Sequence, residues 1–79
     1  MYYVYVISSE SKKYIYVGLT NDVSRRFNEH NKGLNKTTKP YRPFKLILTE
    51  NHNSRSEARD REKYLKSGSG KEFLKKLIK

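Results

Sequence analysis

The chain has 79 residues, no cysteine and a formal net charge of +10, from 18 Lys and Arg residues against 8 Asp and Glu residues. This length predicts a single domain over residues 1–79 and excludes a multidomain enzyme with a separate specificity module. Without cysteine, neither a disulfide framework nor a cysteine zinc cluster stabilises so small a core. Compact basic domains of this kind are typical of proteins that bind an anionic partner, most commonly nucleic acid.

The hydrophobic fraction is low, at 34%, but seven tyrosines and three phenylalanines argue against a disordered chain. No apolar run approaches the roughly 18 residues that a membrane-spanning helix requires. The first seven residues carry no basic segment and are followed by polar Ser8, so they do not resemble a signal peptide. We therefore expect a soluble, cytoplasmic protein without a membrane association.

Three segments rich in β-branched and aromatic residues predict strands, at Tyr2–Ser8, Tyr14–Thr20 and Phe44–Thr49. Five polar residues join the first two segments, which favours an antiparallel hairpin. Its turn type stays open, because the connection lacks an Asn-Gly pair.

Side chains alternate across a strand, so each of the first two strands has a tyrosine-rich face and an aliphatic face. Tyr5 lies on the tyrosine-rich face of the first strand, and Tyr16 and Gly18 lie on that of the second. We expect the aliphatic faces in the core. A glycine inside a strand commonly marks close approach by a ligand or another backbone. The simpler interpretation is that the tyrosines cover a half-exposed sheet with their hydroxyls in water.

Helix boundaries follow from capping residues. Asp22 suits a helix N-terminus and Gly33 the position just after its end. Ser54 and Ser69 each precede a glutamate by three residues, which predicts two capping boxes, and the first of these helices runs to about Ser67. The fold class is therefore α+β, in the order β-β-α-β-α-α, with a three-stranded antiparallel sheet flanked by helices.

Two helical features are candidates for chemistry. Arg26 and His30 are four residues apart, so they share a helix face where a guanidinium can bind a phosphate. The alternative is an ordinary solvated basic helix. Glu62 falls on the inward apolar stripe of its helix, where a carboxylate is costly unless it is paired or holds a cation. An ion pair with Arg59 or Arg61, or an i−4/i+4 surface pair, is an equal alternative.

Together these features resemble the GIY-YIG nuclease superfamily. The segments Tyr3-Val4-Tyr5 and Tyr16-Val17-Gly18 stand at its two signature positions. Arg26 lies eight residues after Gly18, His30 follows one helical turn later, and Glu62 lies on the second helix. The resemblance covers almost the whole chain and is closest to small, uncharacterised bacterial members that consist of this domain alone. Tyrosine replaces the first signature glycine and valine the second signature isoleucine.

The resemblance implies hydrolysis of phosphodiester bonds with one divalent cation. Glu62 would hold Mg²⁺ or Mn²⁺, and Arg26 would stabilise the charge that develops on the scissile phosphate. Tyr5 would activate the attacking water, and His30 is the rival base because its reference pKa of about 6.5 suits that task better. For Tyr5 to act, its pKa must fall. Tyr16 would orient water or phosphate.

Gly18 would keep the pocket open. We expect Tyr5, Tyr16, Arg26 and Glu62 to converge on one cleft. Other basic residues are expected to contact DNA phosphates rather than bases, with weak sequence preference. They are Lys32, Lys36, Lys39, Arg42 and Lys45.

The sequence therefore predicts a metal-dependent DNA endonuclease, a hydrolase that acts in DNA repair or on branched or damaged DNA and has nucleic acid and a targeting protein as partners. The alternative is a non-catalytic, basic nucleic-acid-binding module on the same fold, whose aromatic residues stack on bases. A protein bound to ribosomal RNA would use the charge and ignore the pocket.

Overall fold

A computed structural model describes residues 1–78 and shows a three-stranded antiparallel sheet. The strands are β1 (Tyr2–Ser9), β2 (Ile15–Thr20) and β3 (Phe44–His52), and β1 lies between the other two. The predicted α+β class and element order are confirmed. β3 is three residues longer than the sequence indicates, because its last residues pair with the start of β1.

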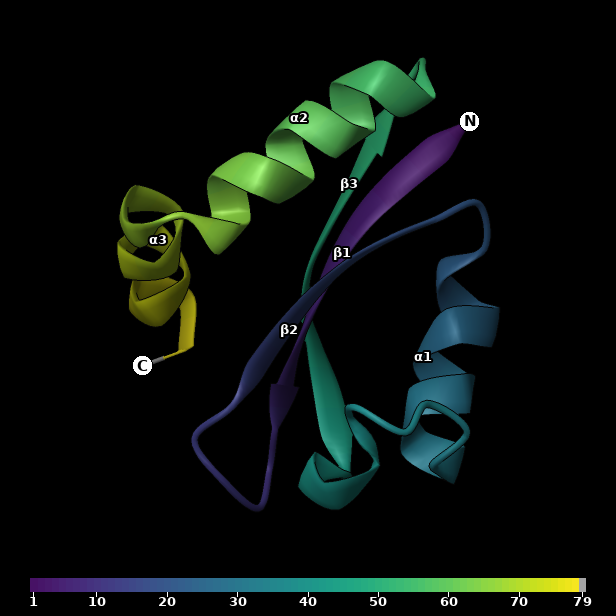
Figure 1. The fold of residues 1–79 in the computed structure, drawn as a ribbon, viewed down its shortest axis with the longest axis vertical. Helices are drawn as coiled ribbons and strands as arrows, with labels where there is room; N and C mark the ends of the chain where they lie inside the picture. Colours follow the sequence, from purple (N-terminus) through teal and green to yellow (C-terminus); the bar gives the residue numbers. More distant parts are fainter. Residues whose placement is uncertain (79) are drawn as a thin grey trace.

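Three α-helices flank the sheet: α1 (Val23–Lys32), α2 (Arg55–Lys66) and α3 (Gly68–Ile78). A short 3₁₀ helix, Lys39–Tyr41, lies in the segment expected to be an irregular basic loop. Figure 1 shows α1 on one side of the sheet and α2 with α3 on the other. Within residues 1–78, no helix is long and apolar enough to cross a membrane.

Each face of the sheet has its own core. On the aliphatic face, Val4, Val6 and Val17 pack with buried side chains of α2 and α3. On the tyrosine-rich face, Tyr5 packs with Ile7 and with several aromatic side chains, including the partly buried Phe27 of α1. The exposed fraction of Tyr5 is 0%. The simpler interpretation, tyrosines with hydroxyls in water, is therefore wrong for Tyr5, because α1 covers this face.

The predicted caps of the first two helices are present. An Asp22 carboxylate oxygen accepts a hydrogen bond from the backbone N–H of Arg25 at 3.1 Å, and α1 ends at Gly33 in the left-handed conformation. The Ser54 hydroxyl oxygen accepts from the backbone N–H of Glu57 at 3.2 Å. These caps satisfy backbone donors that a helix leaves without partners and fix where α1 and α2 begin.

The start of α3 differs from the prediction. Ser69 lies inside the helix, and the Ser67 hydroxyl instead accepts from the backbone N–H of Gly70 at 3.3 Å. A Cβ at Gly70 would collide with the Tyr64 carbonyl oxygen and lie 2.5 Å from the Leu65 Cα. The glycine therefore lets α3 turn tightly against the end of α2, which is a tertiary contact that the capping-box pattern does not encode.

Candidate active site

The site is built around the pairing of Tyr5 with Gly18. These residues face each other across β1 and β2, and the Tyr5 ring covers the glycine. A Cβ at residue 18 would lie 2.5 Å from the Tyr5 hydroxyl oxygen. The position must therefore be glycine if the ring is to lie where it does. The close approach is made by the Tyr5 side chain, not by the ligand or backbone that the strand pattern favoured, and the ring fills the space that Gly18 was expected to keep open.

A buried chain of hydrogen bonds runs from Tyr5 through His30 to Thr38. The Tyr5 hydroxyl lies 2.9 Å from Nε2 of His30, and Nδ1 of His30 lies 2.8 Å from the Thr38 hydroxyl oxygen. All three side chains are 0% exposed. The Tyr16 ring completes the cluster, with its centroid 4.9 Å from that of His30 and 6.2 Å from that of Tyr5.

Arg26 lies at the edge of this cluster and is held by a neighbouring carboxylate. Its Nη1 donates to Oε1 of Glu29 at 2.8 Å, and the two side chains are 33% and 31% exposed. The guanidinium is also close enough to Tyr5 to affect its ionisation. Arg26 is thus partly accessible to a ligand from outside, whereas Tyr5 and His30 are covered.

Burial governs the ionisation of the cluster. It raises the pKa of Tyr5 to about 12, against a lowering effect of the Arg26 charge. The fall in the pKa of Tyr5 that a base would need is therefore not observed. Burial, followed by the Arg26 charge, lowers the pKa of His30, so the ring is neutral at pH 7. Partial burial lowers the pKa of Arg26, but Tyr5 and Glu29 together raise it above its usual value.

Glu62 stands apart from these residues. It lies on α2, across the sheet from α1, and its carboxylate accepts from Nζ of Lys66 at 3.1 Å. Its side chain is only 15% exposed. This is the i,i+4 pair that the sequence left as an alternative. Among residues 1–78 no group of three or more His, Asp or Glu side chains is arranged to hold a metal ion.

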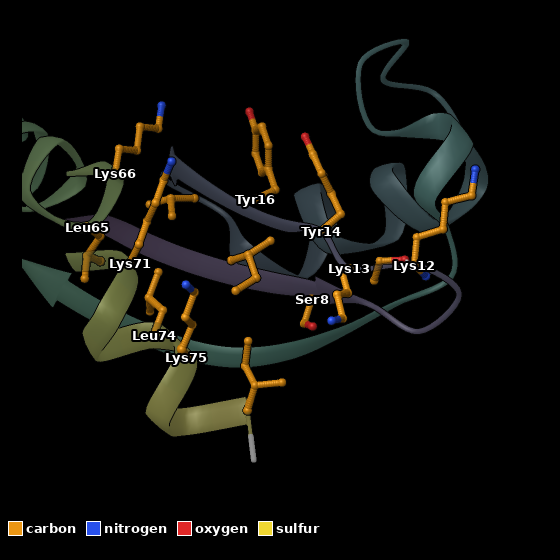
Figure 2. Close-up of a pocket in the computed structure, with 14 residues that line it drawn as sticks. Ser8, Lys12, Lys13, Tyr14, Tyr16, Leu65, Lys66, Lys71, Leu74 and Lys75 are labelled. Carbon is orange, nitrogen blue, oxygen red and sulfur yellow. Dashed lines mark hydrogen bonds between the residues drawn. The ribbon is translucent and has the colours of Figure 1, made fainter. Parts of the chain in front are cut away.

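A groove of about 800 Å³ is lined by the hairpin of β1 and β2 and by α2 and α3. Val17, Leu65 and Leu74 contribute apolar surface to it, and Tyr16 lies at its border. Figure 2 shows the Tyr16 hydroxyl and the Lys66 amine pointing to the same side. Of the four residues expected to share one cleft, only Tyr16 lines this groove, and Glu62 approaches it only through its partner Lys66. The structure therefore does not bring Tyr5, Arg26 and Glu62 together in this groove.

The groove contains a basic cluster that sequence analysis missed. Its members come from the hairpin between β1 and β2 and from the two C-terminal helices: Lys12, Lys13, Lys66, Lys71 and Lys75. We call them the groove lysines. The spacing of Lys71 and Lys75, i and i+4, was the one available signal.

The five basic residues singled out from the sequence lie elsewhere and are exposed. Lys32 ends α1, and Arg42 donates from Nη1 to its carbonyl oxygen at 3.1 Å. Lys36 and Lys39 lie between α1 and β3, and Lys45 lies on β3. Contact of these residues with phosphates stays a prediction, as do the catalytic roles of the site residues.

Comparison with known proteins identifies the family of this chain. Residues 1–76 match the GIY-YIG catalytic domain. A UPF0213 protein of Staphylococcus haemolyticus is 36% identical over 77 residues, covering 96% of this chain and 93% of the relative. Another, from Halobacterium salinarum, is 45% identical over 67 residues, covering 84% of this chain and 86% of the relative.

A solved structure supports the fold as well. The solution NMR structure of a UPF0213 protein from Bacillus halodurans has a TM-score of 0.57 and 35% sequence identity, covering 99% of this chain and 86% of that chain. The chain therefore belongs to the GIY-YIG family. Its most similar relatives include proteins of the UPF0213 group.

Proposed function

We propose that this chain is a metal-dependent DNA endonuclease that hydrolyses phosphodiester bonds in branched or damaged DNA. The observation that carries the proposal is the cluster of Tyr5, Tyr16 and His30 packed over Gly18, with Arg26 at its accessible edge. Membership of the GIY-YIG family supports nuclease activity.

The alternative, a non-catalytic nucleic-acid-binding module, explains less of this arrangement. Exposed aromatic and basic side chains are sufficient to stack on bases and contact phosphates. A fully buried tyrosine hydrogen-bonded to a neutral histidine contributes nothing to such binding. Burying these polar groups is costly unless each finds a partner, so the cluster is better explained by chemistry at the Tyr5 oxygen.

Arg26 is the group that first meets the scissile phosphate in this proposal. Its guanidinium already binds the Glu29 carboxylate, and a phosphate presents oxygens with matching geometry. Exchange of Glu29 for phosphate would uncover the Tyr5 oxygen and place a fixed positive charge where negative charge develops. Tyr16, which borders the groove, orients the incoming phosphate or water.

Glu62 is the proposed metal ligand, and the residues present fit one kind of ion. The donor is a single carboxylate, which suits a hard cation such as Mg²⁺ or Mn²⁺ that keeps several waters and is completed by substrate phosphate. When bound, the ion would neutralise phosphate charge and stabilise the leaving oxygen. Lys66 must release Glu62 for this to occur, so metal binding is expected to be weak without DNA.

Positively charged side chains would hold the DNA substrate through its phosphates. The groove lysines and the exposed lysines around the end of α1 lie on different parts of the surface, and both sets would contact phosphates. A targeting protein would supply the location of the damaged or branched site, since backbone contacts alone carry little sequence information.

Cleavage assays with purified variants test the proposal. Nicked, flapped, branched and single-stranded DNA would be incubated with Mg²⁺ or Mn²⁺ and, separately, with chelator. We expect Glu62→Gln and Arg26→Ala each to lower cleavage by about 10²-fold or more, the scale of losing one preorganised charged group. Glu62→Gln should leave DNA affinity unchanged or slightly stronger.

Asp60→Asn is the matched control, because Asp60 is an exposed carboxylate on the same helix. It should leave cleavage unchanged. If Glu62 serves only as half of an ion pair with Lys66, Glu62→Gln should lower the melting temperature and spare cleavage. Wild-type protein that binds DNA but cuts no substrate with either metal would favour the binding module.

A further inference from the structure

Thr38 is a fully buried polar side chain that the proposed mechanism does not use. It comes from the segment between α1 and the 3₁₀ helix, and its hydroxyl oxygen lies 2.8 Å from Nδ1 of His30. Within residues 1–78 this is the one hydrogen bond of that hydroxyl, and the residue is 0% exposed. Its proton therefore has a single available acceptor, the imidazole nitrogen.

Two proton arrangements fit the distances. A neutral imidazole has one N–H donor and one bare nitrogen acceptor. Either Thr38 donates to Nδ1 and Nε2–H donates to the Tyr5 oxygen, or Tyr5 donates to Nε2 and Nδ1–H donates to Thr38. In the second arrangement the Thr38 proton is sealed in the interior without a partner, which carries the full desolvation penalty.

In the first arrangement the remaining proton is that of Tyr5, at the accessible edge of the cluster. Arg26 and Glu29 are the charged groups there, and Tyr16 is the neighbouring titratable side chain. The guanidinium only donates hydrogen bonds. The Tyr5 hydroxyl is itself buried and, within residues 1–78, has no second acceptor, but it lies next to the partly exposed Arg26–Glu29 pair. A phosphate or water oxygen that reaches this edge can therefore accept its proton, whereas the Thr38 proton has no such neighbour.

We propose that Thr38 is a positioning residue: its hydroxyl donates to Nδ1 of His30 and holds the ring in the tautomer whose Nε2–H donates to the Tyr5 oxygen. The inference deepens the proposed nuclease function and rests on it for its catalytic meaning. In this arrangement His30 is not the base toward Tyr5. Its N–H would stabilise negative charge on the phenol oxygen once the Tyr5 proton has passed to a phosphate or water oxygen at the edge of the cluster. Tyr5 can then accept a proton from the attacking water, with His30 as its support.

The tautomer is measurable without any enzymatic assay. Long-range ¹H–¹⁵N correlation spectra of the labelled protein at neutral pH show which imidazole nitrogen carries the proton. We expect His30 to have a protonated Nε2 and a bare Nδ1. A protonated Nδ1 would overturn the proposal.

Variants of Thr38 test whether its hydroxyl controls the ring. Thr38→Val keeps the shape and removes the donor, so we expect the His30 Nδ1 resonance to move as it loses its hydrogen bond. Thr38→Ser keeps the hydroxyl and should retain the wild-type position. Thr37→Val is the matched control, because Thr37 is the exposed neighbour in the same segment. An unchanged Nδ1 resonance in Thr38→Val would contradict the assignment.

Kinetics separate positioning from a purely structural role. Thr38 is buried and touches no DNA, so Thr38→Val should lower kcat by about 10-fold with KM unchanged, as loss of an orienting partner does elsewhere. Thr38→Ser should recover most of the rate. Equal kcat in Thr38→Val and wild type would refute positioning. A protein with the expected tautomer that cuts no DNA would contradict the nuclease proposal while supporting the hydrogen-bond direction.

Discussion

Arg26 illustrates how a single residue is kept ready for an anion. The carboxylate of Glu29 occupies one side of the guanidinium at 2.8 Å, in a pair that is about two-thirds buried. A phosphate must compete with this internal partner. Glu29 therefore neutralises part of the Arg26 charge in the free protein, and under the proposed function it would weaken the first contact with DNA.

Replacement of Glu29 by glutamine should strengthen that contact. The pair is partly exposed, so its net contribution is small, about 0.2–1 kcal/mol, and we expect DNA affinity to rise by no more than about 5-fold at low salt. Fluorescence anisotropy with a labelled duplex measures the change. Asp60→Asn is the control, because it removes the same charge from an exposed carboxylate on α2 instead of α1. Equal gains in both variants would show a general charge effect instead of competition at Arg26.

The buried His30 predicts a pH dependence of stability. Its folded-state pKa lies below the unfolded value of about 6.5, because burial and Arg26 disfavour the charged ring. The unfolded chain thus binds more protons as the pH falls below about 6.5, and stability decreases in that window. Above it the contribution of His30 is fully present.

Thermal unfolding between pH 7 and 5.5 tests this dependence. The melting temperature of the wild type should fall with acid, and His30→Gln should reduce the slope. The control is His52→Gln, because His52 lies on β3 beside Glu50 and away from the cluster. A slope that disappears with His52→Gln and persists with His30→Gln would contradict the assignment.

At the scale of elements, the hairpin of β1 and β2 fixes the site through its register. The pairing places Tyr5 opposite Gly18, and a shift of one residue would send the Tyr5 side chain to the other face. The phenol ring fills the space that a side chain at residue 18 would need. The geometry of the strands therefore decides where the hydroxyl lies.

Gly18→Ala tests this dependence on space. The added methyl group must displace the Tyr5 ring, and overpacking of this kind costs about 1–3 kcal/mol of unfolding free energy. Urea denaturation measures it. Gly68→Ala is the control, because nothing lies within 4 Å of the added Cβ, and alanine in a helix is favoured by roughly 0.5–1 kcal/mol. Gly18→Ala as stable as wild type would refute the close approach.

The sequence encodes local features well and tertiary contacts poorly. Strand alternation placed Tyr5, Tyr16 and Gly18 on one face of the sheet, and helical spacing placed Arg26 and His30 on one face of their helix. The structure then brings His30 against the tyrosines. Thr38 gave no signal, because its role depends on a loop that folds back onto the end of α1.

The misplaced start of α3 has the same cause. Ser69 satisfies the capping-box pattern, but packing of α3 against the end of α2 gives that role to Ser67. The distance between Glu62 and the tyrosine cluster was likewise invisible, since it depends on which face of the sheet α2 covers.

At the scale of the whole molecule, lysine side chains form two separate positively charged surfaces, which we call the two fields. The groove lysines line the groove together with Tyr16, and one of them, Lys66, is the partner of Glu62. A second set, Lys32, Lys36 and Lys39, lies at the end of α1 and in the segment that follows. A groove of about 800 Å³ is the size of a small-molecule pocket, so under the proposed function it would take unpaired nucleotides in preference to a duplex. The two fields would therefore bind different parts of one branched substrate.

Two triple variants separate the fields. Replacing Lys12, Lys13 and Lys71 with glutamine should weaken binding of flapped DNA more than binding of plain duplex, because it removes contacts to the unpaired strand. Replacing Lys32, Lys36 and Lys39 with glutamine should weaken both substrates equally.

Salt titrations of affinity give the measurement. Each lost phosphate contact should reduce the slope of log affinity against log salt by about 0.9 for duplex and about 0.7 for a single strand. The two triples remove the same total charge, so general electrostatics cannot distinguish them, and each serves as the control for the other. If both change the two substrates alike, the groove does not hold an unpaired strand, and the proposed action on branched DNA would need a partner protein to select the substrate.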